Sequence, residues 1–348
     1  MISRASDRAR VWAVVLAGGE GERLRPLVQR WLGCHRPKQY CTFTGTRSMF
    51  QHTVDRASRL VHPRRIVAVA AQAHRAELAQ QLSGRPIGAT LLQPDNRDTA
   101  AGIFLPLAYI KAIDPDATVL ILPSDHFVQP EERFARIARR MIAAADRWRD
   151  RLILLAVPPD RPEVEYGWIA PGRPLGASTI LPVRAVSAFI EKPGAAEAAS
   201  AMAGGGLWNT LVIAARLETL WELGWQCFAD MMPLFDRVEQ AARLGGDLNL
   251  EEIYARMPRW NFSSDLLSRV PERVAVVEAD GLLWSDWGRP ERILGTLTTI
   301  GRAPAFPPEL VAGTGAALAL PTPDQARALR AVPARRHAGA AAARRRAV

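Results

Sequence analysis

One stretch constrains the fold of this chain more than any other. Residues 11–15 are apolar and mostly valine and alanine, and a glycine-rich loop follows them almost at once. A short apolar run that ends at glycines is typical of a buried parallel strand. The loop leaves the carboxyl end of that strand and contains Gly18, Gly19 and Gly21. Without side-chain bulk, successive backbone N–H groups in such a loop can close around a phosphate.

Two basic residues follow the glycines, Arg23 and Lys38, and both types of side chain bind phosphate oxygens. The stretch is not a Walker A loop, because the chain has no GxxxxGK[ST] motif. It is not the dinucleotide-binding fingerprint either, because Leu24 stands where the third glycine belongs. By itself the stretch fits a phosphate-binding loop or an ordinary tight turn equally well.

Strands and helices alternate through the first half of the chain. Apolar strands are predicted at residues 65–71, 89–92, 117–122 and 151–157. Helices are predicted between them, at residues 48–61, 74–82, 99–113 and 131–149, with Pro106 bending the third of these. The second half is predicted to hold strands at 183–190 and 207–214, helices up to 244 and at 250–256, and a strand pair at 273–278 and 281–284.

This alternation predicts an α/β fold with a Rossmann-like, mostly parallel sheet that helices cover on both faces. Residues 11–300 are expected to form one compact unit, with halves at about 11–160 and 161–300, after an N-terminal extension at 1–10. After residue 300 the chain has eight arginines and two acidic residues, Glu309 and Asp324. Residues 301–348 therefore carry +6 of the formal net charge of +10. We predict that this tail is disordered, with one short helix near 324–329.

Composition excludes several classes of protein. The chain has no run of 18 apolar residues, which argues against a membrane-spanning segment. Its three cysteines, Cys34, Cys41 and Cys227, form no CxxC pair, so neither a disulfide framework nor a zinc knuckle is expected. A cytoplasmic location fits this cysteine usage best. The positive charge lies mainly in the tail, and we expect no nucleic-acid partner.

Two aspartates are candidate metal ligands. Asp125 directly follows the strand predicted at 117–122, and Asp286 follows the last predicted strand. Open α/β sheets bind ligands beyond the carboxyl ends of their strands, so Asp125 should lie near the glycine loop. A Mg²⁺ ion between a carboxylate and bound phosphates would remove the repulsion between them. Each aspartate is also an ordinary helix-cap or turn residue, and that alternative remains open here.

Polar segments at other strand ends could contact the rest of a substrate. Residues 93–100 contain Gln93, Arg97 and Thr99, with Asp98 as the predicted N-cap of the following helix. A loop of this polarity can bind a nucleobase, although it equally resembles ordinary turn chemistry. Residues 166–168, 189–193 and 208–210 each combine an aromatic residue with hydrogen-bonding groups or glycine, as sugar sites often do.

The order of these segments narrows the interpretation. The chain reads GGxGxRLxPL, PKQ, QPxxRxTA, PSDH, YGW, FxEKP, WN and a late Asp-Trp-Gly. In this order the motifs resemble the sugar-phosphate nucleotidyltransferases, and most closely the mannose-1-phosphate guanylyltransferases, over residues 11–300. The resemblance implies a nucleotidyltransferase fold of the GT-A-like type, whose first half binds the nucleotide and whose second half binds the sugar.

The resemblance also implies roles for individual residues. The GTP phosphates and Mg²⁺ would be held by Gly18, Gly19, Gly21, Arg23, Lys38, Asp125 and Asp286, with the two aspartates as metal ligands and with Arg23, Lys38 and both aspartates as the catalytic set. The guanine would face Gln93, Arg97 and Thr99. The sugar 1-phosphate would contact Gly167, Glu191, Lys192 and Asn209. Its phosphate oxygen would attack the α-phosphorus of GTP, giving GDP-mannose and pyrophosphate.

Three departures from the family pattern stand out. Residues 28–36 form a longer spacer than usual between RLxPL and PKQ, and it could reshape the lid over the phosphates. Asp98 replaces the Asn or Gly usual before TA, which bears on base recognition, and residues 210–211 are Thr-Leu where Ser-Gly often follows WN, which bears on sugar identity. The companion isomerase domain of some relatives is not expected.

Other functions stay open at this point. The chain could transfer another nucleotide or accept another sugar 1-phosphate, or it could be a catalytically silent relative that binds a nucleotide sugar and regulates a partner enzyme. An RNA-binding protein acting through the arginine-rich tail is a further alternative, and deletion of residues 301–348 would test it. The sequence leaves the oligomeric state open, with a homo-oligomer among the alternatives.

Overall fold

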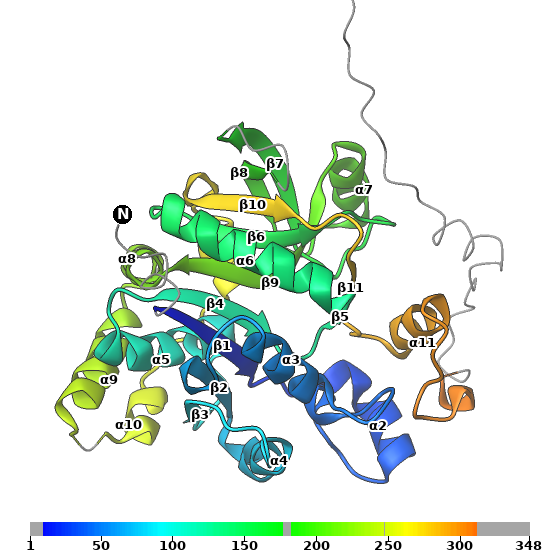
Figure 1. Cartoon of the computed structure of the whole chain (residues 1–348), viewed down its shortest axis with the longest axis horizontal. Helices are drawn as coiled ribbons and strands as arrows, with labels where there is room; N and C mark the ends of the chain where they lie inside the picture. The colour runs from blue at the N-terminus through cyan, green and yellow to red at the C-terminus, as the bar shows by residue number, and fades with distance from the viewer. Residues whose placement is uncertain (1–9, 177–181, 247, 312–348) are drawn as a thin grey trace, which may run out of the picture.

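The computed structural model describes residues 10–176, 182–246 and 248–311 (Figure 1). A nine-stranded mixed sheet has the strand order β3-β2-β1-β4-β9-β6-β10-β8-β7. Its strands are β1 Val11–Ala17, β2 Ile66–Ala71, β3 Ala89–Gln93, β4 Thr118–Pro123, β6 Leu152–Val157, β7 Trp168–Leu175, β8 Val183–Ile190, β9 Leu207–Arg216 and β10 Val274–Glu278. A smaller sheet pairs β5 Phe127–Gln129 with β11 Leu283–Ser285 in antiparallel fashion.

Helices cover both faces of the large sheet. They are α2 Arg25–Leu32, α3 Met49–Ser58, α4 Arg75–Gln81, α5 Asp98–Ile113, α6 Glu131–Arg147, α7 Ala195–Ala203, α8 Leu217–Cys227, α9 Met232–Leu244, α10 Leu250–Ala255 and α11 Pro290–Thr299. The alternation of side chains along β1 separates the two cores: Trp12 and Val14 pack on the side of α5, α8 and α9, whereas Ala13 and Val15 pack on the side of α3 and α6.

The predicted α/β fold is confirmed, and the sheet is mixed. Strands β3, β2, β1 and β4 are mutually parallel, as their buried apolar runs predicted. Strand β9 then runs antiparallel between β4 and β6, and β7 and β8 add an antiparallel edge. Strand β6, from the half predicted at about 11–160, lies between β9 and β10, from the half predicted at about 161–300, so the strands of the two halves interleave. The division into two halves stays a prediction.

Both strands predicted at 273–278 and 281–284 are present, as β10 and β11, but the prediction that they pair with each other is wrong. β10 pairs with β6 on one side and β8 on the other, so neither edge is free for β11. β11 instead pairs with β5, where Trp284 lies opposite Val128. A strand with two occupied edges cannot form a hairpin with its successor, and this occupancy depends on distant parts of the chain. Among the α-helices and strands, α2, β5, β7, α7 and α11 were not predicted from the sequence.

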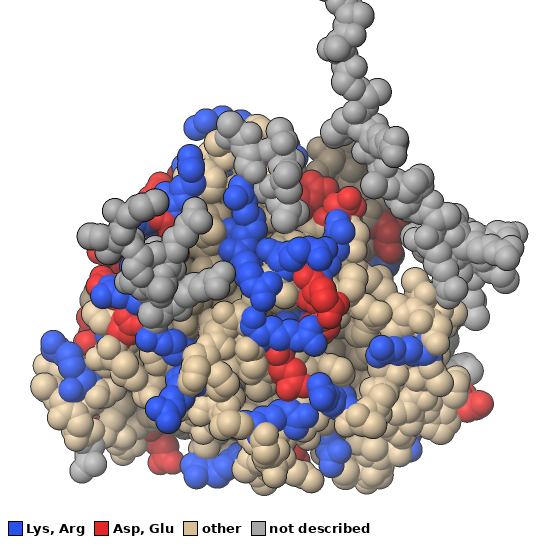
Figure 2. All heavy atoms as spheres, in the orientation of Figure 1, with Lys and Arg blue, Asp and Glu red and all other residues tan. Residues whose placement is uncertain are grey.

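Helix α6, predicted at 131–149, separates its apolar side chains from its basic ones. Phe134, Ile137, Met141 and Ala145 are buried on one stripe, while Trp148 is only partly buried and follows the end of the helix. Figure 2 shows basic side chains gathered over this region with acidic ones among them. The helix therefore anchors one face of the sheet and presents its arginines outward.

The predicted boundary at residue 300 is wrong for the residues that directly follow it. Phe306 and Val311 are buried, and Phe306 packs against Trp31 and Phe43. The backbone N–H of Ala305 donates to the carbonyl of Phe43 at 2.8 Å. These contacts attach residues 301–311 to α2, which forms from the long spacer. The rest of the predicted tail, with the helix at 324–329, lies outside the described residues, as do residues 1–9 of the extension.

The start of α5 differs from the prediction. Asp98 is not the N-cap of α5: Arg97 holds that position, and Asp98 is the first helical residue, with a positive φ of 65°. Its carboxylate accepts from the side-chain amide of Asn261 at 3.1 Å, a contact that the local pattern does not reveal.

Within the described ranges, none of the helices combines the length and apolarity that crossing a membrane would need.

Candidate active site

A pocket of about 360 Å³ opens where β1 and β4 end. The backbone N–H and the hydroxyl of Ser124 both donate to the carbonyl of Leu16, which joins the loops after the two strands. The predicted site residues that line this pocket come from both halves of the chain: Gly18, Gly19, Arg23, Thr99, Asp125, Gly167, Glu191, Lys192, Asn209 and Asp286. Gly21, Lys38, Gln93 and Arg97 are not among its lining residues.

Gln39 of the PKQ motif shapes the glycine loop. Its side-chain amide donates to the carbonyls of Ala17 at 2.9 Å and Gly19 at 2.7 Å. Gly21 adopts a positive φ of 67°, and a Cβ at this position would come within 2.9 Å of the backbone nitrogen of Lys38. Gly21 therefore makes the turn that brings the PKQ segment against the loop, whereas Gly18 and Gly19 face the pocket.

Lys38 joins the two candidate metal ligands from behind the pocket. Only 5% exposed, it forms a 2.8 Å ion pair with Asp125 and donates to the backbone carbonyl of Asp286 at 2.6 Å. The Asp125 side chain is 37% exposed. Burial acts to raise the pKa of Asp125, but the Lys38 ammonium and His126 together keep the pKa below its ordinary value. Asp125 therefore reaches the pocket as a carboxylate at neutral pH.

Asp286 is held by more partners than Asp125. Its carboxylate accepts from the Tyr166 hydroxyl at 2.8 Å, the Gly288 N–H at 2.9 Å and Arg292 at 2.8 Å. Burial opposes ionisation, yet Lys38 and Arg292 keep the pKa of Asp286 far below its ordinary value. A Cβ at position 288 would collide with this carboxylate, which explains why glycine follows Asp-Trp at this point.

Arg23, predicted to bind phosphate, is already paired with carboxylates. Its guanidinium lies 3.1 Å from Glu165 and 3.3 Å from Asp286, and the side chain is 54% exposed. Glu165 also pairs with Arg289 and Arg292, both at 2.6 Å. No sequence signal pointed to Glu165 or Arg292, because the two residues are 127 positions apart and neither belongs to a motif. Tyr166 belongs to the YGW motif, but the sequence did not predict its hydrogen bond with Asp286.

A neighbouring hollow of about 310 Å³ shares Gly18 and Gly19 with this pocket. Gln93 and Thr99 line it, together with Arg259, which sequence reasoning missed. The Gln93 side chain is buried, and its amide donates to the Tyr254 hydroxyl at 3.2 Å. The predicted base-binding segment therefore meets the glycine loop at this hollow.

Arg97 does not join Gln93 and Thr99. It pairs with Asp95 at 3.1 Å and is absent from the lining of both cavities. Its position just before α5 places it as the N-cap residue of that helix. Of the three residues predicted to face a base, the structure therefore brings two to the hollow.

The residues predicted to bind sugar meet on the other side of the pocket. A Cβ on Gly167 would lie 2.8 Å from a Glu191 carboxylate oxygen and 3.5 Å from the Asn209 Cβ, so these three residues are immediate neighbours. Burial raises the pKa of Glu191, although Lys192, 3.8 Å away, acts in the opposite direction. Lys192 and Leu211 both have positive φ values, 47° and 56°. Such backbone conformations are uncommon for these residue types and gather at functional sites.

Comparison with known proteins adds to this geometry. The model of a family described as nucleotidyl transferase matches residues 12–299. The chain belongs to the nucleotidyl transferase family. Among its relatives, the xanthan biosynthesis protein XanB of Xanthomonas campestris is 36% identical over 204 residues, which are 58% of this chain and 41% of XanB. The mannose-1-phosphate guanylyltransferase of Escherichia coli K12 is 28% identical over 81% of this chain and 58% of its own length.

The chain thus spans about two fifths to three fifths of the length of these two relatives. Among solved structures, one described as a mannose-1-phosphate geranyltransferase from Thermus thermophilus superimposes with a TM-score of 0.69 at 30% identity, over 82% of this chain and 79% of that one. The inositol-1-phosphate CTP transferase of T. maritima, with a TM-score of 0.54 and 13% identity, shares the fold alone.

The donor atoms of this nucleotidyl transferase fit a divalent ion such as Mg²⁺. Asp125 and Asp286 line the same pocket and offer carboxylate oxygens, the ligands that Mg²⁺ prefers. The negative charge of Asp286 acts to raise the pKa of Asp125, so the two carboxylates repel each other. A cation between the two would relieve this repulsion.

The methyl group of a Gly19→Ala variant should weaken binding of a nucleoside triphosphate, for which GTP serves as the probe, without harming the fold. Gly19 lines both hollows, has no positive φ, and has no neighbouring atom within 4 Å of an added Cβ. The methyl would enter the space expected for the triphosphate. We expect about a tenfold higher Kd for GTP by calorimetry, with stability unchanged or higher by about 0.5 kcal/mol. Gly295→Ala on α11 has equally open surroundings and should leave the Kd unchanged.

Proposed function

We propose that this nucleotidyl transferase transfers a guanylyl group from GTP to mannose 1-phosphate, giving GDP-mannose and pyrophosphate. The observation that carries the proposal is a single pocket lined by Gly18, Gly19, Asp125, Asp286, Glu191 and Asn209, with the two aspartates linked by Lys38 from outside the lining. The relatives named after mannose 1-phosphate support the choice of substrate. In the proposed orientation, GTP occupies the side of Gln93 and Thr99, and the sugar phosphate occupies the side of Glu191.

The chemistry needs alignment of two anions rather than a general base. A phosphate oxygen of mannose 1-phosphate forms a bond to the α-phosphorus of GTP, while the bond to the bridging oxygen breaks and its electron pair leaves with pyrophosphate. The nucleophile is already an anion at neutral pH. Arg23 and Lys192 border the pocket and can offset the repulsion between the two substrates. A Mg²⁺ ion held by Asp125 and Asp286 would stabilise negative charge on the phosphates.

Arg23 must exchange partners in this proposal. In the structure its guanidinium binds Glu165 and Asp286. A triphosphate in the pocket carries more negative charge than either carboxylate, and Arg can bind phosphate oxygens through two N–H groups. Glu165 therefore holds Arg23 at the edge of the pocket, within reach of the phosphates.

A substrate panel tests the proposal. Several nucleoside triphosphates are crossed with several sugar 1-phosphates, and pyrophosphate release is measured with Mg²⁺ present. The highest kcat/KM is expected for GTP with mannose 1-phosphate. A higher value for another pair would assign another substrate to the same site. Binding of GDP-mannose without turnover of any pair would instead support a regulatory relative that lacks catalysis.

Glu191→Gln is expected to act on the sugar substrate. Glu191 lies beside Gly167, lines the pocket together with Asn209, and forms its ion pair among the described residues with Lys192. Loss of its charge should raise the KM for mannose 1-phosphate about tenfold, the effect of one lost charge-assisted hydrogen bond, and change kcat little. Initial-rate kinetics with varied mannose 1-phosphate provide the measurement. Glu197→Gln on the exposed first turn of α7 is the matched control and should match the unmodified protein.

A further inference from the structure

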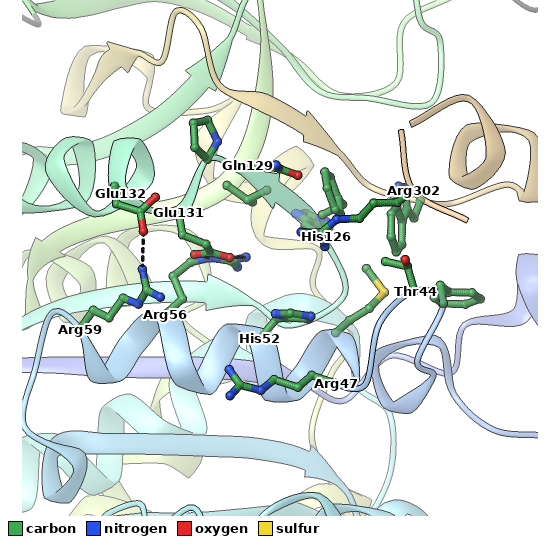
Figure 3. A pocket seen from close by; sticks show the side chains of 16 residues that line it. Thr44, Arg47, His52, Arg56, Arg59, His126, Gln129, Glu131, Glu132 and Arg302 are labelled. Carbon is green, nitrogen blue, oxygen red and sulfur yellow. Dashed lines mark hydrogen bonds and ion pairs between the residues drawn. The ribbon is translucent and has the colours of Figure 1, made fainter. Parts of the chain in front are cut away.

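A separate pocket of about 270 Å³ lies between α3, β5 and the start of α6 (Figure 3). We call it the α3–β5 pocket. His52 on α3 and Gln129 at the end of β5 face it from opposite sides (Figure 3), and Arg302, from the segment after α11, and His126 also line it. The sequence motifs account for none of these residues except His126 of PSDH. The pocket belongs to no part of the proposed reaction.

The α3–β5 pocket shares a wall with the candidate active site. His126 lines both cavities and directly follows Asp125. Trp287, which lines the α3–β5 pocket, directly follows Asp286 and stacks on Phe127 with ring centroids 4.7 Å apart. The residue after Asp125 and the residue after Asp286 therefore both line the α3–β5 pocket.

Trp287 has two unusual properties. Its φ is 45°, a conformation that a bulky residue rarely adopts. Its side chain is almost fully buried, with 2% of the residue exposed, yet the indole N–H has no hydrogen-bond partner among the described residues. The same is true of Nδ1 of His126. Buried polar atoms are nearly always paired, so this wall of the cavity is incompletely hydrogen-bonded in the conformation that the structure shows.

The charge of the pocket favours an anion. Arg56 binds Glu131 through two hydrogen bonds of 2.9 Å, Arg59 pairs with Glu132, and Arg47 pairs with Asp55 outside the lining. Arg302 has no carboxylate within ion-pair distance among the residues that the structure describes. Four arginines and two glutamates line the cavity, so its lining carries a net positive charge. Because Arg47 and Arg302 are exposed, both can turn toward a ligand.

We propose that the α3–β5 pocket binds a phosphate ester with a ring body, either a sugar phosphate or a nucleotide, and that the bound ligand alters catalysis through Trp287. Arg302 and Arg47 would bind the phosphate, and the apolar wall that includes Phe43 and Met49 would contact the ring. A ligand packed against Trp287 would bias the backbone of the segment that holds Asp286. The binding is independent of the proposed reaction, whereas the effect on turnover rests on it.

Calorimetry on the full-length chain, without Mg²⁺, tests the binding. The titrated probes are mannose 1-phosphate, mannose 6-phosphate, GDP and inorganic phosphate, and the proteins are Gly19→Ala, to weaken the active site, and Gly19→Ala/Arg302→Gln. We expect one ring-bearing probe to bind Gly19→Ala and to lose at least tenfold in affinity when Arg302 is replaced. Preference for a sugar phosphate or for GDP identifies the source of the ligand.

A matched variant separates this site from general electrostatics. Arg256→Gln removes an exposed arginine next to α10 that lines none of the three cavities. Gly19→Ala/Arg256→Gln should bind the probe as Gly19→Ala does. Equal affinity in the Arg302 and Arg256 variants would overturn the site, as would binding of inorganic phosphate as tightly as of every ester. Thermal melts identify any variant that fails to fold, and Arg47→Gln then provides a second test.

Steady-state kinetics test the effect on catalysis. With the unmodified protein at saturating substrates and Mg²⁺, GDP or mannose 6-phosphate, if selected by calorimetry, should change kcat at least twofold, and Arg302→Gln should abolish that change. If calorimetry selects mannose 1-phosphate, which is also the proposed substrate, kcat at saturation should itself differ at least twofold between the unmodified protein and Arg302→Gln. A probe that binds at the α3–β5 pocket but leaves kcat unchanged would overturn the effect through Trp287. If no substrate pair is turned over, the calorimetric result still decides whether the pocket binds a phosphate ester.

Discussion

Replacement of Asp125 by asparagine is expected to lower kcat by about 10²- to 10³-fold, the loss seen when one preorganised electrostatic group is removed from an active site. Asparagine keeps the shape of the side chain and removes its charge. The change weakens the proposed Mg²⁺ site and removes the carboxylate that forms an ion pair with Lys38. Pyrophosphate release at several Mg²⁺ concentrations measures both kcat and the Mg²⁺ dependence.

The companion variant Glu191→Gln shows whether this loss is specific. Asp125→Asn should reduce kcat and shift the Mg²⁺ requirement upward, while Glu191→Gln should raise the KM for mannose 1-phosphate. Because Asp125→Asn leaves the buried Lys38 ammonium without its carboxylate partner, it should also lower the melting temperature, so the shift in the Mg²⁺ requirement, and not stability, identifies the metal role. Equal losses of sugar affinity in both variants, with kcat preserved, would contradict the roles assigned to these two residues.

Asp286→Asn is expected to lower the free energy of unfolding by about 3 kcal/mol at pH 7, as removal of one partner from a buried ion pair does. The carboxylate belongs to a residue that is 7% exposed, and it accepts from Arg292, Tyr166 and the Gly288 N–H. Asparagine leaves Arg292 paired with Glu163 and Glu165 but removes its contact with a charged Asp286. Urea unfolding followed by tryptophan fluorescence gives the free energy.

The pH dependence of this difference has a defined sign. The pKa of Asp286 lies far below its ordinary value in the folded state, so ionisation stabilises the fold. This contribution is complete above the ordinary pKa of aspartate, about 4, and is lost as the pH falls toward the folded-state pKa. The difference between the unmodified protein and Asp286→Asn should be constant from about pH 5 to 8 and shrink below about pH 4. A difference that grows on acidification would contradict this arrangement.

Local sequence patterns predicted the parts of the fold that depend on neighbouring residues. The valine-rich run at 11–15 predicted β1 because apolar β-branched residues suit a strand covered on both faces. The apolar stripe of α6 follows from helical periodicity alone. The position of Asp125 beside the glycine loop also follows from a local rule, since parallel strands end at the same edge of the sheet.

The predictions that failed depend on competition between distant segments. β11 pairs with β5 because both edges of β10 are occupied. Residues 301–311 pack on the domain because Phe306 meets Trp31 and Phe43, which lie far away in the chain. The hydrophobic periodicity within each segment predicts neither of these contacts. Arg97 is similar: its place in a motif predicted a base contact, and its pairing with Asp95 was visible only in the structure.

By itself, the sequence determined which chemical groups this protein can use: the glycines, Arg23, Lys38, two aspartates and their order along the chain. Only the tertiary structure decided which of them meet. Lys38 reaches the Asp286 carbonyl across 248 residues, and Arg292 reaches Glu165 across 127. Backbone propensity acts over a few residues, whereas these contacts require the closure of long loops, which burial of the shared core stabilises. The same closure places Trp287 and His126 on the wall of the α3–β5 pocket.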